Sequence, residues 1–136
     1  MPRHEIRRLS IRTMAQAEKA IRSTGACEES VPIMAPKLLH LVLAVKGVRA
    51  PVANILKQEC LSLGAEASVS QWSVNCAKPR TDVVLAGTLS QMRKLAVKLR
   101  RQGYGLPEEI GADYSDLARK ITKVLEEYGL RKKSPT

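Results

Sequence analysis

Two short apolar runs, each followed by a segment whose apolar residues recur every three or four positions as in a helix, place the strongest constraint on how this chain can fold. Residues 38–45 are apolar on both alternating faces except at His40, and residues 81–87 are almost as apolar. Runs of this kind are typical of strands that are covered on both sides. We therefore expect the first run to be a central strand, and we expect the second to be another strand.

Each run leads into a predicted helix with clear end signals. The first helix follows Pro51, which suits a first turn, and ends before Gly64, which suits the position just beyond a helix. The second begins after Thr88 and ends at Gln102. At 100° per residue both helices are amphipathic, with apolar stripes of Val52, Ile55, Leu56, Cys60 and Leu63 in the first and of Leu89, Met92, Leu95, Ala96 and Leu99 in the second. We expect the first stripe to pack on the sheet.

Weaker patterns predict the rest of the secondary structure. Residues 13–22 form an expected helix that begins at the N-cap Thr13, and residues 23–36 form a connector that is interrupted by glycine and proline. Residues 65–70 and 71–76 are expected to be two short strands, the second alternating through Trp72, Val74 and Cys76. A last helix is predicted over 113–128.

The order of these elements predicts one α/β domain. A chain of 136 residues with 44% hydrophobic content can bury one core. We expect a small mixed β-sheet covered by helices, as a two-layer or three-layer sandwich over residues 13–130. Residues 1–12 are predicted to be a basic arm or an edge strand, and residues 131–136 a disordered basic tail.

Composition narrows the classes of function. The net charge of +10 favours an anionic partner, but much of that charge lies near the two ends of the chain, and aromatic residues, which stack unpaired bases, make up only 3%. No run is long and apolar enough for a membrane span or a signal peptide, so we expect a cytoplasmic protein. The three cysteines fit neither a disulfide framework nor a metal motif, and we expect free thiols and no bound metal.

Four segments carry a resemblance to a known family. They are Ala50-Pro51-Val52-Ala53-Asn54-Ile55-Leu56-Lys57-Gln58-Glu59, Leu61-Ser62-Leu63-Gly64-Ala65-Glu66-Ala67, Thr81-Asp82-Val83-Val84-Leu85-Ala86-Gly87-Thr88-Leu89-Ser90-Gln91, and Tyr104-Gly105-Leu106 with the helix that follows. In this order they resemble the N-terminal accessory region, outside the catalytic barrel, found in a subset of bacterial dihydropteroate synthases. The resemblance covers roughly residues 33–125.

The resemblance implies a link to folate biosynthesis without the chemistry of the enzyme. Those synthases share a pterin-binding (β/α)8 barrel, which needs about 250 residues. The 136 residues of this chain cannot supply one, so we expect no catalytic residue and no cofactor. The leading hypothesis is an accessory or regulatory domain that docks on such a barrel or on a second copy of itself. The alternatives are a small basic nucleic-acid-binding protein and a protein that binds a phosphate or pterin ligand.

A docking surface and two possible ligand sites follow from the helical periodicity. The docking face predicted on the first amphipathic helix consists of Asn54, Lys57, Gln58 and Leu61, with an apolar residue on what should be the solvent side. Gly87, Thr88 and Arg93 form a candidate anion site at the start of the second helix, although Thr88 can also be a simple N-cap. Glu59 falls inside an apolar stripe, so it either faces a ligand or finds a cationic or backbone partner.

Overall fold

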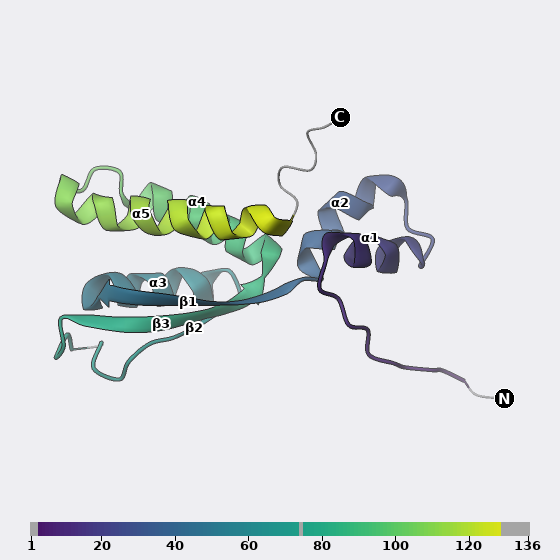
Figure 1. Ribbon diagram of the computed structural model, residues 1–136, viewed down its shortest axis with the longest axis horizontal. Coiled ribbons are helices and arrows are strands. Elements are labelled where there is room, and N and C mark those ends of the chain that lie inside the picture. Colours follow the sequence, from purple (N-terminus) through teal and green to yellow (C-terminus); the bar gives the residue numbers. More distant parts are fainter. Residues whose placement is uncertain (1–2, 74, 129–136) are drawn as a thin grey trace.

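The computed structural model describes residues 3–73 and 75–128, and within them the chain forms three strands and five α-helices (Figure 1). The elements are, in order, α1 (Met14–Arg22), α2 (Val31–Met34), β1 (His40–Arg49), α3 (Ala50–Ser62), β2 (Glu66–Ser68), β3 (Arg80–Thr88), α4 (Leu89–Gln102) and α5 (Glu108–Leu125), with 3-10 turns at Glu28–Ser30, Ala35–Lys37 and Glu126–Tyr128. The predicted α/β class is confirmed. In this part of the chain no helix combines the length and the apolar character needed to cross a bilayer.

The three strands form a sheet in the order β1-β3-β2, with both pairs antiparallel. The expectation of a mixed sheet is therefore wrong, and so is the central place predicted for residues 38–45, because β3 lies in the middle and β1 at an edge. Apolar residues on both faces of β1 suggested cover on both sides. In fact Val42 points away from the helices and is 64% exposed.

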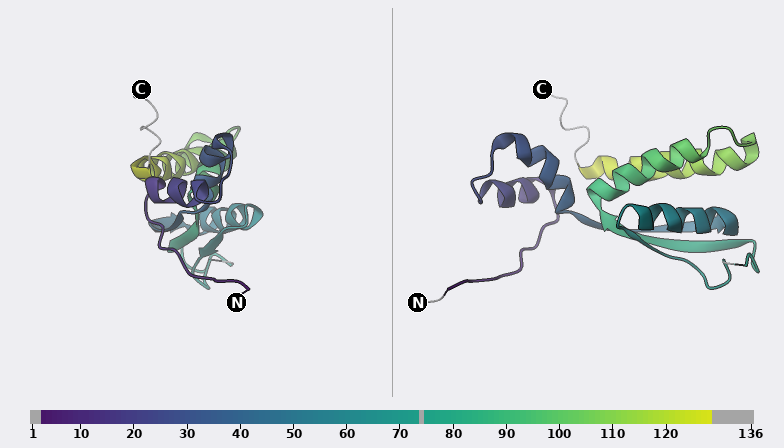
Figure 2. Two further views of the ribbon diagram at one scale, coloured as in Figure 1. Left: turned by 90° about the vertical axis from the view of Figure 1, so that its right-hand side faces the viewer. Right: turned by 180° about the vertical axis from the view of Figure 1, so that it is seen from behind.

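Helices cover only one face of the sheet, so the fold has two layers (Figure 2). The pairs Leu41–Gly87 and Leu43–Leu85 face the helices, while Val42–Ala86 and Ala44–Val84 face the other way. Side chains from the covered face pack with α3, α4 and α5 in one hydrophobic core. The stripe predicted on α4 is buried throughout. In the stripe predicted on α3, Ile55 is exposed and Leu63 is only half-buried. Ala53, which was not part of the predicted stripe, is buried beside Val52 and Leu56 instead.

The segment before β1 forms a small helical lobe beyond one end of the sheet (Figure 1). Thr13 caps α1 as predicted, through a reciprocal capping box with Gln16. The connector of residues 23–36 contains more helix than expected, because Pro32 occupies the first turn of α2. Residues 3–10 are exposed and form neither helix nor strand, whereas residues 131–136 lie outside the described part.

The second of the two short predicted strands, over residues 71–76, is not seen in the described residues 71–73 and 75–76. Turn hydrogen bonds hold this segment instead, including one from the Cys76 amide to the Ser73 carbonyl oxygen at 3.1 Å. The predicted alternation is accordingly wrong, since Trp72 and Cys76 are exposed while Ser73 is buried. Val74, the remaining member of the predicted pattern, lies outside the described residues.

The last helix begins at Glu108, five residues before its predicted start at Asp113. The glycine and proline residues of the preceding stretch suggested a longer break. Pro107, however, ends the loop at the N-cap position, and Gly111 fits inside the helix because an added Cβ would lie 3.0 Å from the Gly103 carbonyl oxygen. The glycine thus allows the close approach of α5 to the end of α4.

Candidate functional site

The docking face predicted on α3 is only partly open. Leu61 is 42% exposed and Gln58 is exposed, but Lys57 is half-buried. Asn54 donates a hydrogen bond from Nδ2 to the Ser73 carbonyl oxygen at 2.8 Å, so it holds the loop between β2 and β3 against the helix. The available surface is therefore centred on Gln58 and Leu61, with the loop as its border.

Glu59 lies on the opposite side of α3 from this face and has partners on α4. Its Oε1 lies 3.3 Å from Lys98 Nζ, and its Oε2 accepts a hydrogen bond of 2.7 Å from Gln102 Nε2. The carboxylate is largely shielded, with 16% of the side chain exposed. An acid in this position joins two helices and meets the need of a shielded carboxylate for a cation and a donor.

A shallow hollow of about 440 Å³ opens beside this ion pair. Its walls come from α3, α4 and the loop after α4, and they comprise Glu59, Lys98, Arg101, Gln102, Tyr104 and Leu106. Tyr104 and Leu106 are exposed. The helical pattern predicted that Glu59 needs a partner, but it identified neither Lys98 nor Gln102, because pairing across two helices depends on how the helices pack and not on spacing along the chain.

The three residues of the predicted anion site have different surroundings. Thr88 Oγ1 accepts a hydrogen bond of 3.1 Å from the Gln91 amide, while the Leu89 amide donates to the Leu39 carbonyl oxygen at 2.9 Å. Gly87 is closely packed, since an added Cβ would lie 2.8 Å from the Gln91 side chain and 2.9 Å from Ala65. Capping and packing therefore use much of the hydrogen-bonding capacity and space at this helix start.

Arg93, one turn further along α4, is a half-buried cation. Among the described residues its Nε has no hydrogen-bond partner, and burial lowers the pKa of its guanidinium. At 100° per residue it is separated by 140° around the helix from Lys98, the residue of α4 that pairs with Glu59 on α3. Arg93 therefore differs from Thr88, whose side chain has a hydrogen-bond partner in the capping box.

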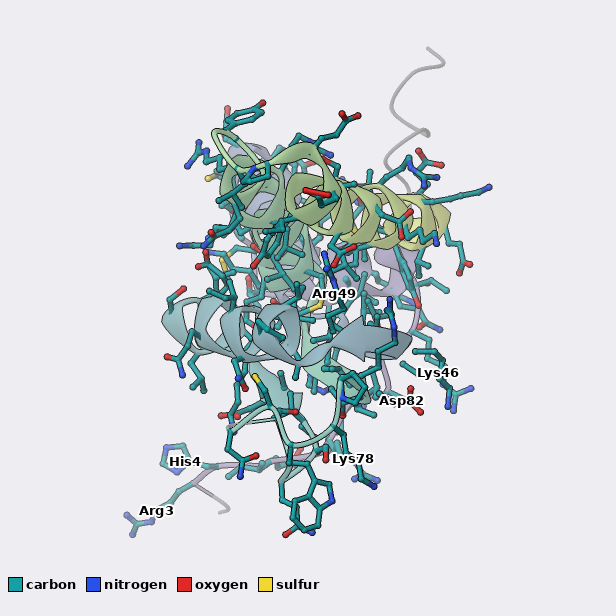
Figure 3. The ribbon with its side chains drawn as sticks, turned by 90° about the vertical axis from the view of Figure 1, so that its left-hand side faces the viewer. Arg3, His4, Lys46, Arg49, Lys78 and Asp82 are labelled. Carbon is teal, nitrogen blue, oxygen red and sulfur yellow. The ribbon has the colours of Figure 1, made fainter. Side chains whose placement is uncertain are left out.

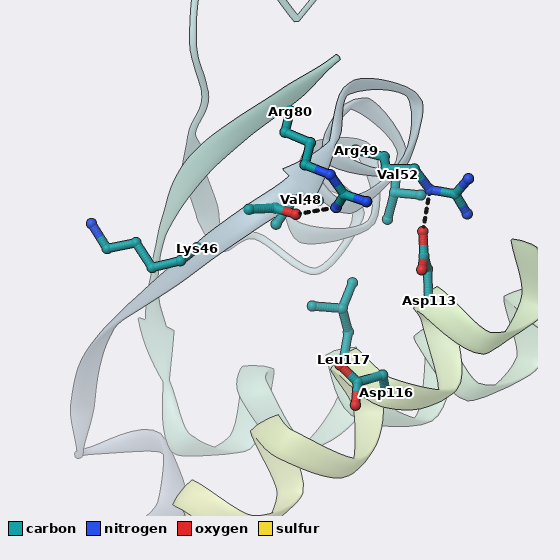
Figure 4. Close-up of a pocket in the computed structure, with 9 residues that line it drawn as sticks. Lys46, Val48, Arg49, Val52, Arg80, Asp113, Asp116 and Leu117 are labelled. Atoms are coloured by element: carbon teal, nitrogen blue, oxygen red, sulfur yellow. Dashed lines mark hydrogen bonds and ion pairs between the residues drawn. The ribbon is translucent and has the colours of Figure 1, made fainter.

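A second polar cavity, which sequence analysis did not predict, surrounds the bulge in β1 (Figure 4). The pairing register shifts between Val45 and Val48, and Gly47 has a φ of +68°. Three cations lie around the bulge, Lys46, Arg49 and Arg80. The run Lys46-Gly47-Val48 was a sequence signal for a break in the strand, but not for a cavity.

Each of these cations has a partner within the chain. Arg49 Nε lies 2.6 Å from Asp113 Oδ2, and Arg80 donates to the Gly47 carbonyl oxygen at 2.6 Å (Figure 4). Lys46 Nζ lies 3.3 Å from Asp82 Oδ2. Figure 3 labels both side chains. The Gly47 amide and Lys46 lower the pKa of the Asp82 carboxyl. The contacts of Asp82 and Arg80 with the Gly47 backbone hold the bulge, whereas Arg49 joins the end of β1 to α5.

The cysteine thiols are in two kinds of environment. Cys60 is fully buried, and burial raises its pKa to about 11, whereas Cys27 and Cys76 are exposed. A protonated, enclosed thiol is a poor nucleophile at neutral pH. Within residues 3–73 and 75–128, no three His, Cys, Asp or Glu side chains come together in a way that could hold a metal ion.

Comparison with known proteins gives one informative match. Over 101 residues, the chain is 35% identical to the probable bifunctional folylpolyglutamate synthase/dihydropteroate synthase of Halobacterium salinarum. The chain resembles a segment of a folate-pathway enzyme. That segment is 74% of this chain but only 12% of the relative, so the chain spans about an eighth of the protein it matches. The predicted likeness to proteins with a dihydropteroate synthase part is thereby confirmed.

Two further comparisons, with protein-family models and with solved structures, found no match.

Proposed function

We propose that this chain is a non-catalytic accessory domain of a folate-pathway enzyme and that it docks on a dihydropteroate synthase-type barrel. The proposal depends on one observation, the 35% identity to a segment that forms 12% of a protein named for two folate-pathway activities. The described fold has three antiparallel strands, whereas the catalytic fold of such synthases is a (β/α)8 barrel. A segment with this sheet is therefore a domain separate from the catalytic barrel.

The outer face of α3 is the docking surface that we favour. Leu61 offers an exposed apolar contact, and Gln58 and Lys57 offer polar ones beside it. Apolar centres with polar rims are the usual anatomy of protein interfaces. The hydrogen bond from Asn54 to Ser73 fixes the border of this surface, which reduces the entropy lost on docking.

Light scattering on mixtures of this chain with a dihydropteroate synthase barrel tests the proposal. We expect a complex that persists from low to moderate salt and that Leu61→Asp abolishes. Val97→Asp is the matched control, because Val97 on α4 is also 42% exposed but lies on another helix. No complex with the barrel, or a complex that Leu61→Asp leaves intact, would contradict docking through this face.

Binding to nucleic acid is the second candidate. The solvent side of α4 carries the exposed cations Lys94, Arg100 and Arg101. The exposed arm before α1 carries three more, Arg3, Arg7 and Arg8, of which Figure 3 labels Arg3. Phosphate contacts of such side chains release counterions, so binding would weaken steeply as salt rises. A strong salt dependence with DNA or RNA, together with no complex with the barrel, would favour this candidate over docking.

A further inference from the structure

The outer edge of β1 is open for pairing with another strand. In the described part of the chain β1 pairs only with β3, although it is ten residues long. The other edge strand of the sheet, β2, has only three residues. Proteins commonly protect long edges, since their free amide and carbonyl groups are templates for another strand. Only the edge of β1 is long enough here to form an extended ladder.

A groove of about 310 Å³ runs along this edge beneath α5. Its floor and roof are mainly apolar, with Leu43 and Val45 from the strand and Leu117, Ile121 and Val124 from the helix. Val124 is 41% exposed. An added strand would lie about 4.8 Å beyond β1 and would place every second side chain in this groove.

The sequence of β1 is complementary to itself in one antiparallel register. If Leu43 pairs with its own counterpart, Leu41 lies opposite Val45 and Val42 lies opposite Ala44. Leu41, Leu43 and Val45 then all face the helix layer, and Val42 and Ala44 all face the open side, as they already do in one copy. Pairing of odd-numbered with even-numbered positions would set groove-facing side chains opposite open-face ones. A centre at Ala44 would keep the faces matched but would set Val42 opposite Lys46 and carry the ladder into the bulge, and a centre at Val42 would shorten the ladder to residues 40–44.

Charge does not oppose this pairing locally, although the chain carries +10. At the groove, Lys120 Nζ lies 3.0 Å from Asp116 Oδ2, and the same carboxylate also pairs with Arg119. In the register centred on Leu43, Lys46 lies opposite the His40 of the second copy, and Asp82 already pairs with Lys46 at 3.3 Å.

We propose that two copies of this chain pair through β1, antiparallel about Leu43, and so join their sheets into one. A two-fold arrangement uses the open edge of each copy against the other and closes the assembly as a dimer. The two grooves become the flanks of the shared ladder, and α5 of each copy covers its seam. The inference does not depend on the proposed function, because it concerns the chain alone.

Light scattering of the purified chain over a wide range of concentration tests the dimer. We expect twice the mass of one chain for the natural sequence and for Val97→Asp, and the mass of one chain for Val124→Asp. The two valines are 42% and 41% exposed, so the substitutions are matched in burial, and only the second places a carboxylate in the groove. Far-UV circular dichroism of both variants checks that each one folds.

Disulfide trapping tests the register in chains whose exposed Cys27 and Cys76 are changed to serine. Val42→Cys mixed with Ala44→Cys should form a cross-linked pair, whereas each variant alone should cross-link poorly, since only unlike positions face each other. A monomer at every concentration, a dimer that Val124→Asp leaves intact, or equal cross-linking of each variant with itself would overturn the inference.

Discussion

Arg49 and Asp113, 64 positions apart in the chain, form an ion pair of 2.6 Å that joins the end of β1 to α5. The same guanidinium donates to the Glu109 carbonyl oxygen at 3.2 Å. The pair fixes how the last helix lies over the open edge of the sheet. Arg49 is the last residue of β1, so the ion pair is located where the chain leaves the sheet for α3.

Arg49→Met, Asp113→Asn and the double variant should show a favourable coupling between the two side chains. Both are about one third exposed, at 36% and 35%, so we expect a coupling below about 1 kcal/mol in the free energy of unfolding. Urea denaturation of the four proteins measures it as a double-mutant cycle. Strictly additive effects would show that the ion pair contributes nothing to stability.

Thr88→Ala should lower the free energy of unfolding by about 1 kcal/mol, because α4 loses its N-cap. Ser90→Ala, one residue into the same helix, should change stability much less. Repeating the denaturation with added inorganic phosphate separates capping from anion binding. If phosphate stabilises the natural chain and Thr88→Ala removes that effect, the candidate anion site at Gly87, Thr88 and Arg93 gains support.

Gly87→Ala should destabilise the fold by about 1–3 kcal/mol through overpacking. The added methyl group would meet the Gln91 side chain at 2.8 Å, Ala65 at 2.9 Å and Met92 at 3.0 Å, which leaves it no free direction. Ala86→Val is the control on the same strand, since residue 86 faces the open side of the sheet. Thermal unfolding measures both, and an unchanged melting temperature for Gly87→Ala would contradict the packing described here.

A thiol reagent should modify two of the three cysteines in the native chain near pH 8. Cys27 and Cys76 are exposed, whereas Cys60 is enclosed by the core and has its pKa raised to about 11 by burial. All three thiols should react after denaturation in urea. Rapid modification of a third thiol under native conditions would show that α3 opens readily from the sheet.

The sequence correctly predicted the features that depend on residues close together in the chain, namely helix stripes and helix caps. The α4 stripe from Leu89 to Leu99 is buried as predicted, and the caps at Thr13 and Thr88 form with their glutamine partners. Helix periodicity and capping depend on residues three or four positions apart. Such patterns carry over directly from sequence to structure.

Features that depend on distant contacts could not be predicted in this way. The edge position of β1 follows from how three strands pair, and its apolar outer residues Val42 and Ala44 gave the misleading signal of a covered strand. The sequence of residues 71–76 alternates like that of a strand, but turn hydrogen bonds at Ser73 and Cys76 and the contact of Asn54 with Ser73 hold the described part of this segment in turns. Glu59 was predicted to need a partner, yet only the packing of α3 on α4 identifies Lys98 and Gln102.

The most direct test of the accessory function is light-scattering mass of this chain with and without a dihydropteroate synthase barrel, at low and at moderate salt. The account predicts a complex of the two proteins that survives the increase in salt and that is lost with Leu61→Asp but not with Val97→Asp. A chain that keeps its own mass in the presence of the barrel at both salt concentrations would contradict it.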